Sequence, residues 1–196
     1  MRSLTRMRRR IGAQRGYTLV EMLTVLLILG VVMAGLTTVF ASATNADADM
    51  NNRFQAQQTA RLALDKLRRE IHCSSSATPA GTDTSSITLT LPSYCKTYSG
   101  SASVTWCTRN ISTNRYALYR VDGATCTGGV KWADFLTPTA TATVCSGALC
   151  VFNYTNQSAS SLAKLHADFP VNPKPIRTVD TYELVDDLVL RNSSRS

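Results

Sequence analysis

The sequence predicts an α+β protein in which one long N-terminal α-helix packs on a small antiparallel β-sheet. Three observations lead to this prediction. An uncharged apolar run of 20 residues follows an arginine cluster, a helical repeat of small apolar residues comes next, and short alternating segments fill the rest of the chain. With 196 residues, the chain has room for one modest globular domain plus an extended element.

The basic charge of the chain is concentrated at its N-terminus. Without the arginines before residue 16, the remaining 15 basic residues exceed the 13 acidic residues by only two, although the formal charge of the whole chain is +8. This distribution predicts a cytoplasmic leader next to a membrane rather than a nucleic-acid-binding face. The six residues are Arg2, Arg6, Arg8, Arg9, Arg10 and Arg15.

The apolar run from Met22 to Ala41 is long enough to span a bilayer as a helix. Because the arginines precede it, we expect the N-terminus in the cytoplasm and the rest of the chain outside. The alternative is a secretory signal peptide cleaved after Ala43, since Ala-Ser-Ala at 41–43 resembles a cleavage site. The run is longer than the apolar segment of such peptides usually is, and an acidic residue, Glu21, directly precedes it.

A second helical segment follows, with no proline or glycine before Pro79. Its apolar residues recur at steps of three and four, which predicts one buried stripe, and Arg61 and Asp65 have the spacing of a surface ion pair. If both segments form one helix from Tyr17 to about His72, it is on the order of 80 Å long. The stripe consists of Ala56, Ala60, Ala63, Leu64, Leu67 and Ile71.

Alternating segments after the helix predict antiparallel strands, joined by loops rich in Thr, Ser, Gly and Pro such as "TPTATAT" and "FPVNPKP". The sheet face that meets the helical stripe is expected to bury Leu89, Leu91, Leu118, Val151 and Phe152. The predicted strands are Ser86–Leu91, Ser103–Thr108, Arg115–Gly123, Cys150–Thr155 and Tyr182–Asn192.

All six cysteines lie beyond the apolar run, in the part that would be exported, which predicts disulfides in an oxidising compartment. Six cysteines allow 15 connectivities, and the sequence does not choose among them. Proximity favours Cys145 with Cys150, and Cys107 with Cys126 across one strand, which leaves Cys73 with Cys95. The spacings do not match a zinc site, so we expect no metal or cofactor.

Enzymatic motifs are not found: the sequence has no G-x-S-x-G elbow, no phosphate-binding glycine loop and no H-E-x-x-H. Asp186 and Asp187 are adjacent and would point to opposite faces of a strand, and His72 and His166 are far apart. We therefore expect no catalytic residues. A stacking surface for nucleic acid or sugar is a weaker alternative to core packing for the aromatic residues Tyr94, Tyr98, Trp106, Tyr116, Tyr119 and Trp132.

The stretch "RGYTLVEMLTVLLIL" is the most specific motif in the chain. It resembles the class III signal of type IV pilins and type II secretion pseudopilins, in which glycine, an aromatic residue, Thr, Leu, Val or Ile, and Glu precede an apolar helix. The resemblance implies that a prepilin peptidase cleaves between Gly16 and Tyr17 and that the new Tyr17 amine is N-methylated. Tyrosine stands where phenylalanine is commoner in the family.

The resemblance also implies a role for Glu21 in assembly. Cleavage creates a positive amine four residues before Glu21, and two such charges about 4 Å apart attract by roughly 4 kcal/mol at an effective dielectric of about 20. That attraction offsets much of the cost of an acid at the edge of lipid. In the family the partner amine is that of a neighbouring subunit. From the residues alone, the chain's own amine and the headgroup region remain alternatives.

The resemblance implies four segments: a leader at 1–16, a transmembrane assembly helix at 17–43, the amphipathic half of the helix at 44–73, and an exported β-rich head with disulfides at 74–196. "LALDKLRREI", "YALYRVDG" and "LVLRN" are loosely similar to minor pilins and to J-type minor pseudopilins. The expected protein is a minor subunit of a type IV pilus-like or type II secretion filament. It would be stored in the inner membrane as a single-pass protein and then assembled into a periplasmic or cell-surface filament.

The partners implied by the resemblance are other pilin or pseudopilin subunits, the prepilin peptidase and methyltransferase, the inner-membrane assembly platform, and membrane lipid. One alternative is a pilin that captures DNA or a surface glycan, which would require an exposed basic cluster among Arg109, Arg115, Arg120 and Lys131. Another is a single-pass membrane protein that never polymerises, in which Gly16 would remain uncut.

Overall fold

The computed structural model describes residues 16–175, 177 and 180–191, and it contains one long helix followed by short strands. The chain divides into two compact units, Met1–Ala48 and Asp49–Ser196. Helix α1 (Leu19–Cys73) has 55 residues and contributes to both units. It confirms the predicted single helix but begins at Leu19 rather than at Tyr17. The head therefore includes the second half of α1 as well as the strands.

The second half of α1 is amphipathic, as predicted, and its buried side carries the stripe of small and branched apolar residues. Ala60, Ala63, Leu67 and Ile71 are fully buried, whereas Leu62 on the opposite side is 52% exposed. Alanines allow the helix backbone to approach the sheet closely, and the larger leucine and isoleucine side chains fill the core near the C-terminal end. Burial of this stripe holds the helix against the sheet.

The strands form one nine-stranded antiparallel sheet and a separate two-stranded hairpin. The main sheet has the order β1-β3-β4-β5-β6-β10-β9-β2, and β11 pairs with β10 along its whole length. The hairpin consists of β7 and β8. The strands are β1 (Ser76–Thr78), β2 (Asp83–Thr84), β3 (Ser86–Thr90), β4 (Ser103–Ser112), β5 (Arg115–Asp122), β6 (Val130–Leu136), β7 (Val144–Cys145), β8 (Ala148–Leu149), β9 (Phe152–Thr155), β10 (Lys164–Val171) and β11 (Tyr182–Val189).

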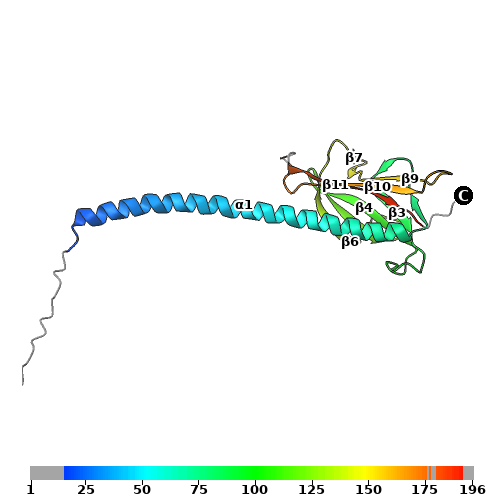
Figure 1. The fold of residues 1–196 in the computed structure, drawn as a ribbon, viewed down its shortest axis with the longest axis horizontal. Coiled ribbons are helices and arrows are strands. Elements are labelled where there is room, and N and C mark those ends of the chain that lie inside the picture. Colours follow the sequence, from blue (N-terminus) through cyan, green and yellow to red (C-terminus); the bar gives the residue numbers. More distant parts are fainter. Residues whose placement is uncertain (1–15, 176, 178–179, 192–196) are drawn as a thin grey trace, which may run out of the picture. The chain divides into compact units, whose positions relative to one another are not determined.

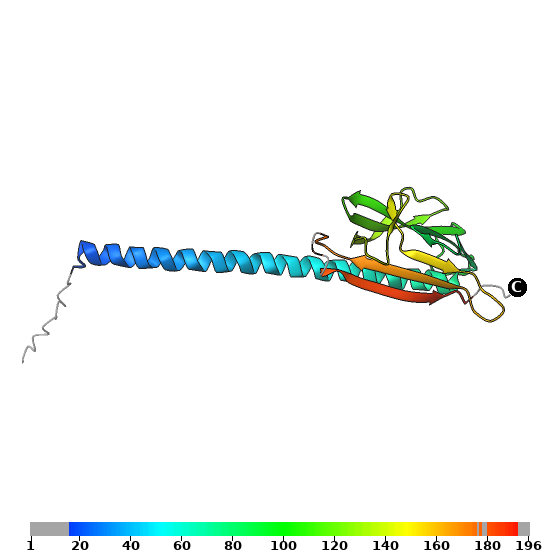
Figure 2. The same cartoon turned by 90° about the horizontal axis from the view of Figure 1, so that it is seen from above.

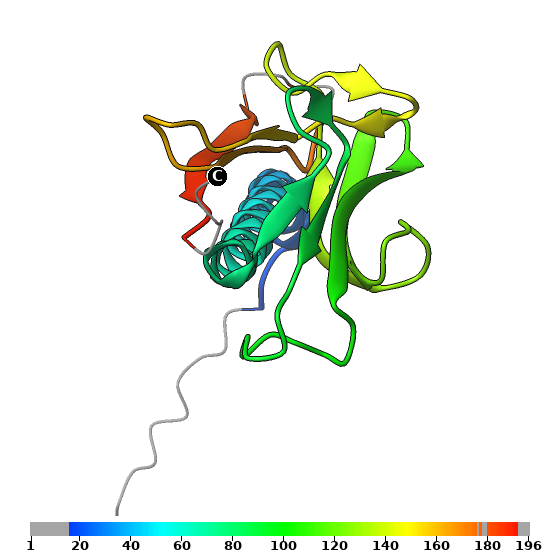
Figure 3. The same ribbon diagram turned by 90° about the vertical axis from the view of Figure 1, so that its right-hand side faces the viewer.

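The sheet curves around the second half of α1. Figure 1 labels the strands beside the helix, and Figure 2 shows β10 and β11, in orange and red, running alongside it. In Figure 3, where the helix is viewed end-on, the green strands β3–β5 lie on its other side. One hydrophobic core fills the space between helix and sheet, and all five residues expected there are buried: Leu89, Leu91, Leu118, Val151 and Phe152.

Six strands were not predicted, namely β1, β2, β6, β7, β8 and β10, and two of these, β6 and β10, are long. The first, β6, contains a bulge where its register with β5 shifts, and Phe135 has a positive φ of 63° there, so its side chains do not alternate regularly. The second, β10, includes Phe169, Pro170 and Val171, which the sequence predicted as loop. The N–H and carbonyl of one strand residue point to the same side. The Pro170 carbonyl accepts from the Thr137 N–H (2.9 Å), on the side away from β11. The N–H that proline lacks would point to that side too, so its absence removes no bond to β11.

Some predicted boundaries and contacts also differ. Strand β4 continues four residues beyond the predicted end at Thr108, and β11 ends at Val189 rather than at residue 192. The predicted ion pair between Arg61 and Asp65 is replaced by other contacts. Arg61 donates to the Tyr182 hydroxyl (3.0 Å), and Asp65 accepts from Arg68 (3.2 Å) on the next turn of the helix.

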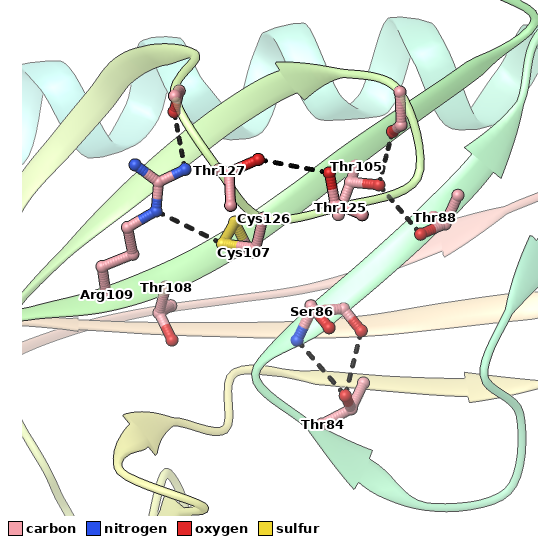
Figure 4. Close-up of a disulfide and its surroundings, with 12 residues drawn as sticks. Thr84, Ser86, Thr88, Thr105, Cys107, Thr108, Arg109, Thr125, Cys126 and Thr127 are labelled. Atoms are coloured by element: carbon pink, nitrogen blue, oxygen red, sulfur yellow. Dashed lines mark hydrogen bonds between the residues drawn. A yellow bond between two sulfur atoms is a disulfide. The ribbon is translucent and has the colours of Figure 1, made fainter.

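The six cysteines form the three disulfides that proximity favours: Cys73–Cys95, Cys107–Cys126 and Cys145–Cys150. The first ties the last residue of α1 to the loop after β3. The second ties β4 to the loop between β5 and β6 (Figure 4). The third closes the β7–β8 hairpin, whose turn residues Ser146 and Gly147 both have positive φ, as a tight two-residue hairpin turn requires.

Candidate processing and assembly site

The predicted cleavage site lies immediately before the helix. Gly16, Tyr17 and Thr18 precede α1, and the Tyr17 side chain is 78% exposed. The first helical backbone bond runs from the Met22 N–H to the Thr18 carbonyl (3.2 Å), so the peptide bond between Gly16 and Tyr17 is outside the helical ladder. The preceding leader arginines, Arg2 to Arg15, lie outside the described residues.

Thr18 and Glu21 form a reciprocal cap at the start of α1. The Thr18 hydroxyl accepts from the Glu21 N–H (3.2 Å), and the Glu21 Oε2 accepts from both the N–H and the hydroxyl of Thr18 (3.3 Å each). This is the capping box, in which Thr at the N-cap and Glu three residues later satisfy donors that the helix leaves unpaired. The carboxylate also lies at the positive end of the helix dipole.

The capping box gives Glu21 a function within its own chain that we did not predict. The signal was present in the sequence as Thr-x-x-Glu directly before an apolar run, which is the usual pattern of a helix start. In this arrangement the Glu21 carboxylate is held toward the N-terminal side of the helix, where cleavage after Gly16 would place the new amine. The cap and the expected charge pairing are therefore compatible.

After this cap, the first half of α1 is apolar on all sides and its large side chains are exposed. Hydroxyl groups within this half donate to carbonyl oxygens one turn earlier, as from Thr24 to Glu21 (2.9 Å), Thr37 to Ala34 (2.9 Å) and Thr38 to Gly35 (2.8 Å). Such internal bonds make hydroxyls compatible with lipid. In the described part of the chain, α1 is the helix that is long and apolar enough to cross a membrane.

The four basic residues considered for DNA binding are engaged within the head. Arg109 donates to the Gly128 carbonyl (2.6 Å) and stacks 4.2 Å from the centre of the Tyr119 ring; its contact with the sulfur of Cys126 is visible in Figure 4. Arg120 is paired with the fully buried Glu70 (2.8 Å) and with the more exposed Asp122 (2.8 Å). These contacts use the cationic groups as structural links between sheet, helix and loops.

The other two basic residues share one acid. Arg115 and Lys131 both pair with Asp134, at 2.9 and 2.8 Å. Burial acts to raise the pKa of the Asp134 carboxyl, but hydrogen bonds from Arg115 and Lys131 outweigh burial, and the pKa lies below its ordinary value. Asp134 therefore stays ionised and neutralises part of the local positive charge, so these four residues do not form the free basic cluster that DNA capture requires.

The remaining candidate residues are dispersed. Trp106 and Tyr116 are buried in the core, while Tyr94 is 69% exposed, so the aromatic residues do not form one stacking surface. His166 pairs with Asp187 (2.8 Å), whereas Asp186 pairs with Arg68 (2.6 Å), as expected for adjacent acids on opposite faces of a strand. Among the described residues, no group of three or more His, Cys, Asp or Glu side chains could hold a metal ion.

Comparison with known families locates the motif on which this site depends. Residues 11–37 match the family model described as the prokaryotic N-terminal methylation motif. The match covers Gly16, Tyr17, the capping box and the first part of the apolar helix. Comparisons with curated proteins and with solved structures gave no match. The prepilin-type motif at the start of a long apolar helix, in a chain with an α+β head, supports membership of the type IV pilin and pseudopilin family.

Proposed function

We propose that the protein is a minor subunit of a type IV pilus-like or type II secretion filament. The methylation motif at residues 11–37 is the observation that carries this proposal. A prepilin peptidase cleaves after Gly16, the Tyr17 amine is methylated, and the mature chain is held in the inner membrane by the first half of α1 until it is assembled. The protein acts as a structural component rather than as an enzyme.

The topology follows from the charge distribution. The arginines before residue 16 keep the N-terminus in the cytoplasm, where the peptidase removes them, and the head lies on the other side of the membrane. The three disulfides support this orientation because such bonds persist in an oxidising compartment. The large head with three disulfides favours a minor over a major subunit.

Glu21 is the assembly contact in this proposal. Once the leader is removed, its carboxylate pairs with the Tyr17 amine of a neighbouring subunit and sets the axial register of the two helices. The capping box orients the carboxylate for this contact while it stabilises the first turn of α1. The same residue thus supports the helix before assembly and contacts the neighbour after it.

Two substitutions at Glu21 separate these contributions. Glu21→Gln retains a side chain that can close a capping box but removes the charge, and Glu21→Ala removes both. We expect both variants to be cleaved at Gly16 yet to be lost from sheared filaments, as measured by immunoblotting with the membrane fraction as the control. Normal incorporation of Glu21→Gln would contradict a charge-based contact, and normal incorporation of both variants would remove Glu21 from assembly.

A further inference from the structure

A pocket of about 200 Å³ lies on the outer face of the sheet, over β9 and β10. Asp83, Asn153 and His166 occupy one row across β2, β9 and β10, because Asn153 is the register partner of both other residues. Asp168 follows two residues after His166 and lines the same pocket. Successive side chains of a strand alternate between faces, and the buried neighbour Ala167 faces the core, so His166 and Asp168 face away from the core.

Asp168 is an unusual residue for this face because it is only 5% exposed. Its Oδ2 accepts a hydrogen bond from the hydroxyl of Thr141 (2.8 Å), in the loop that covers this part of β10. Its Oδ1 is buried, and within the described residues it has no hydrogen-bond partner. Leaving a buried acceptor unsatisfied is costly, and more so for a charged group, so an orphaned carboxylate oxygen in a pocket points to a missing donor.

The basic side chains on this face do not supply that donor. His166 and Lys164, the preceding outward-facing residues of β10, both contact Asp187 of β11, at 2.8 and 3.0 Å. Asp83 at the rim accepts from the Asn153 side-chain amide (2.7 Å) and adds a second carboxylate to the pocket. The pocket therefore carries acidic groups whose charge the neighbouring cations do not neutralise.

A single metal ion does not fit this arrangement. Asp83 and Asp168 come from β2 and β10, with β9 between them, and Asp168 lies two residues beyond the row that contains Asp83. Their backbones are therefore about 12 Å apart, at roughly 4.8 Å per strand and about 3.4 Å per residue. Calcium requires several oxygen ligands at about 2.3–2.6 Å. The described residues also contain no group of three metal-ligating side chains. An extended organic cation can span this separation, whereas one metal ion cannot.

Val151, Phe152 and the disulfide-bonded Cys150 also line the pocket, but the Phe152 side chain is on the core face with its register partner Ala167. Val151 and Phe152 are each 2% exposed. A lysine or arginine side chain matches the acidic groups of the pocket, because its long stem carries the charged head past the rim at Asp83 to the carboxylate of Asp168.

We propose that this pocket receives a lysine or arginine side chain of a neighbouring protein subunit, and that Asp168 binds the charged head. The identity of the neighbour as a protein subunit rests on the proposed function. The inserted ammonium or guanidinium group donates to the orphaned Oδ1 of Asp168, and Asp83 at the rim attracts the incoming charge. The pocket is thus a lateral contact on the head, separate from the Glu21 contact on the helix.

The test uses the full chain in detergent micelles and Nα-acetyl-arginine methylamide as the probe, with the neutral citrulline analogue as the matched ligand control. Binding is followed by NMR through the backbone amide signals of Asn153 and Asp168. We expect saturable shifts with a dissociation constant on the order of millimolar, and at least tenfold weaker binding of the citrulline analogue. Absence of saturable shifts, or equal binding of both probes, would overturn the proposal, as would calcium ions reproducing the shifts.

Asp168→Asn is expected to weaken binding of the arginine probe at least tenfold, whereas Asp65→Asn, on the exposed face of α1, leaves it unchanged. If Asp168→Asn does not fold, the test uses Asp83→Asn at the exposed rim, which is expected to weaken binding of the arginine probe severalfold. Unchanged binding of the probe by Asp83→Asn would contradict the proposal. Because the probe binds the unassembled chain, Glu21→Gln should bind it normally. Failure of assembly and failure of the pocket are therefore distinguishable.

Discussion

Thr18 and Glu21 form a short motif with a structural function, to which the proposed function adds an assembly contact. The sequence Thr-x-x-Glu begins the helix by closing a capping box, and the same glutamate lies four residues after Tyr17, whose amine the proposed cleavage would expose. The predicted position of Glu21 near the helix start was correct, but we did not predict its bond to Thr18, because we considered only charges as partners for the acid. The local hydrogen bonds between Glu21 and Thr18 are therefore the part of the site that was not predicted.

Thr18→Val tests the cap at the residue scale. The substitution keeps the shape of the side chain and removes the hydroxyl that accepts from the Glu21 N–H, so it should cost about 1 kcal/mol of helix-start stability. We expect about fivefold faster hydrogen exchange at the Glu21 amide in micelles, measured by NMR. Thr24→Val is the matched control, since its hydroxyl donates to a carbonyl one turn earlier. Unchanged exchange in Thr18→Val would refute the capping box.

Gly129, just before β6, is a position where the backbone requires glycine for two reasons. Its φ is +82°, and a Cβ atom there would collide with the Arg120 carbonyl oxygen and lie 2.7 Å from the Val121 Cγ2. The neighbouring Gly128 has a similar φ of +69°, but a Cβ atom there would meet nothing within 4 Å. The pair therefore separates the effect of backbone strain from that of a steric clash.

We expect Gly128→Ala to cost about 1–2 kcal/mol, the typical strain of a left-handed conformation for a residue with a side chain. Gly129→Ala should cost at least about 1–3 kcal/mol more, because overpacking forces backbone shifts. The measurement is the midpoint of thermal unfolding of the full chain in detergent for the two variants. Equal unfolding midpoints of the two variants would contradict the close contact between Gly129 and β5.

At the scale of elements, the helix was predictable because its signal is long and regular. The stripe from Ala56 to Ile71 repeats over several turns without proline or glycine, so the expected face was the buried face. Strands β6 and β10 were not predictable in this way. A bulge at Phe135 interrupts the alternation of β6. In β10, Pro170 makes the sequence resemble a loop, although a proline fits this strand because β11 does not need an N–H from residue 170.

Leu67→Ala tests how firmly α1 is held against the sheet. Leu67 is fully buried, so truncation leaves a cavity between helix and sheet and should destabilise the head by about 2–5 kcal/mol. Leu62→Ala on the exposed face of the same helix should change stability by no more than about 0.5 kcal/mol. The comparison uses unfolding of the two full-length variants by guanidinium chloride in detergent. Similar effects of both variants would contradict the packing described here.

At the scale of the molecule, the chain combines an apolar helical segment with a compact α+β head. The sequence was sufficient to predict the α+β fold class, because an apolar helical run and a helical stripe precede short alternating segments along the chain. It was less informative about the head, where long-range pairs such as Arg120 with Glu70 and Arg68 with Asp186 join residues that local patterns do not connect. The pocket around Asp168 depends on three strands and a loop and has no local signature.

The central proposal is that the protein is a processed subunit of the pilin and pseudopilin family, and its mature N-terminus tests this proposal most directly. The chain would be expressed in cells that contain a prepilin peptidase, purified from the membrane, and its N-terminal peptide identified by mass spectrometry. The account predicts a chain that begins at Tyr17 with a methylated amine and lacks all six leader arginines. A chain that retains Gly16 and its leader, or that begins at Thr44 after signal-peptide cleavage, would contradict it.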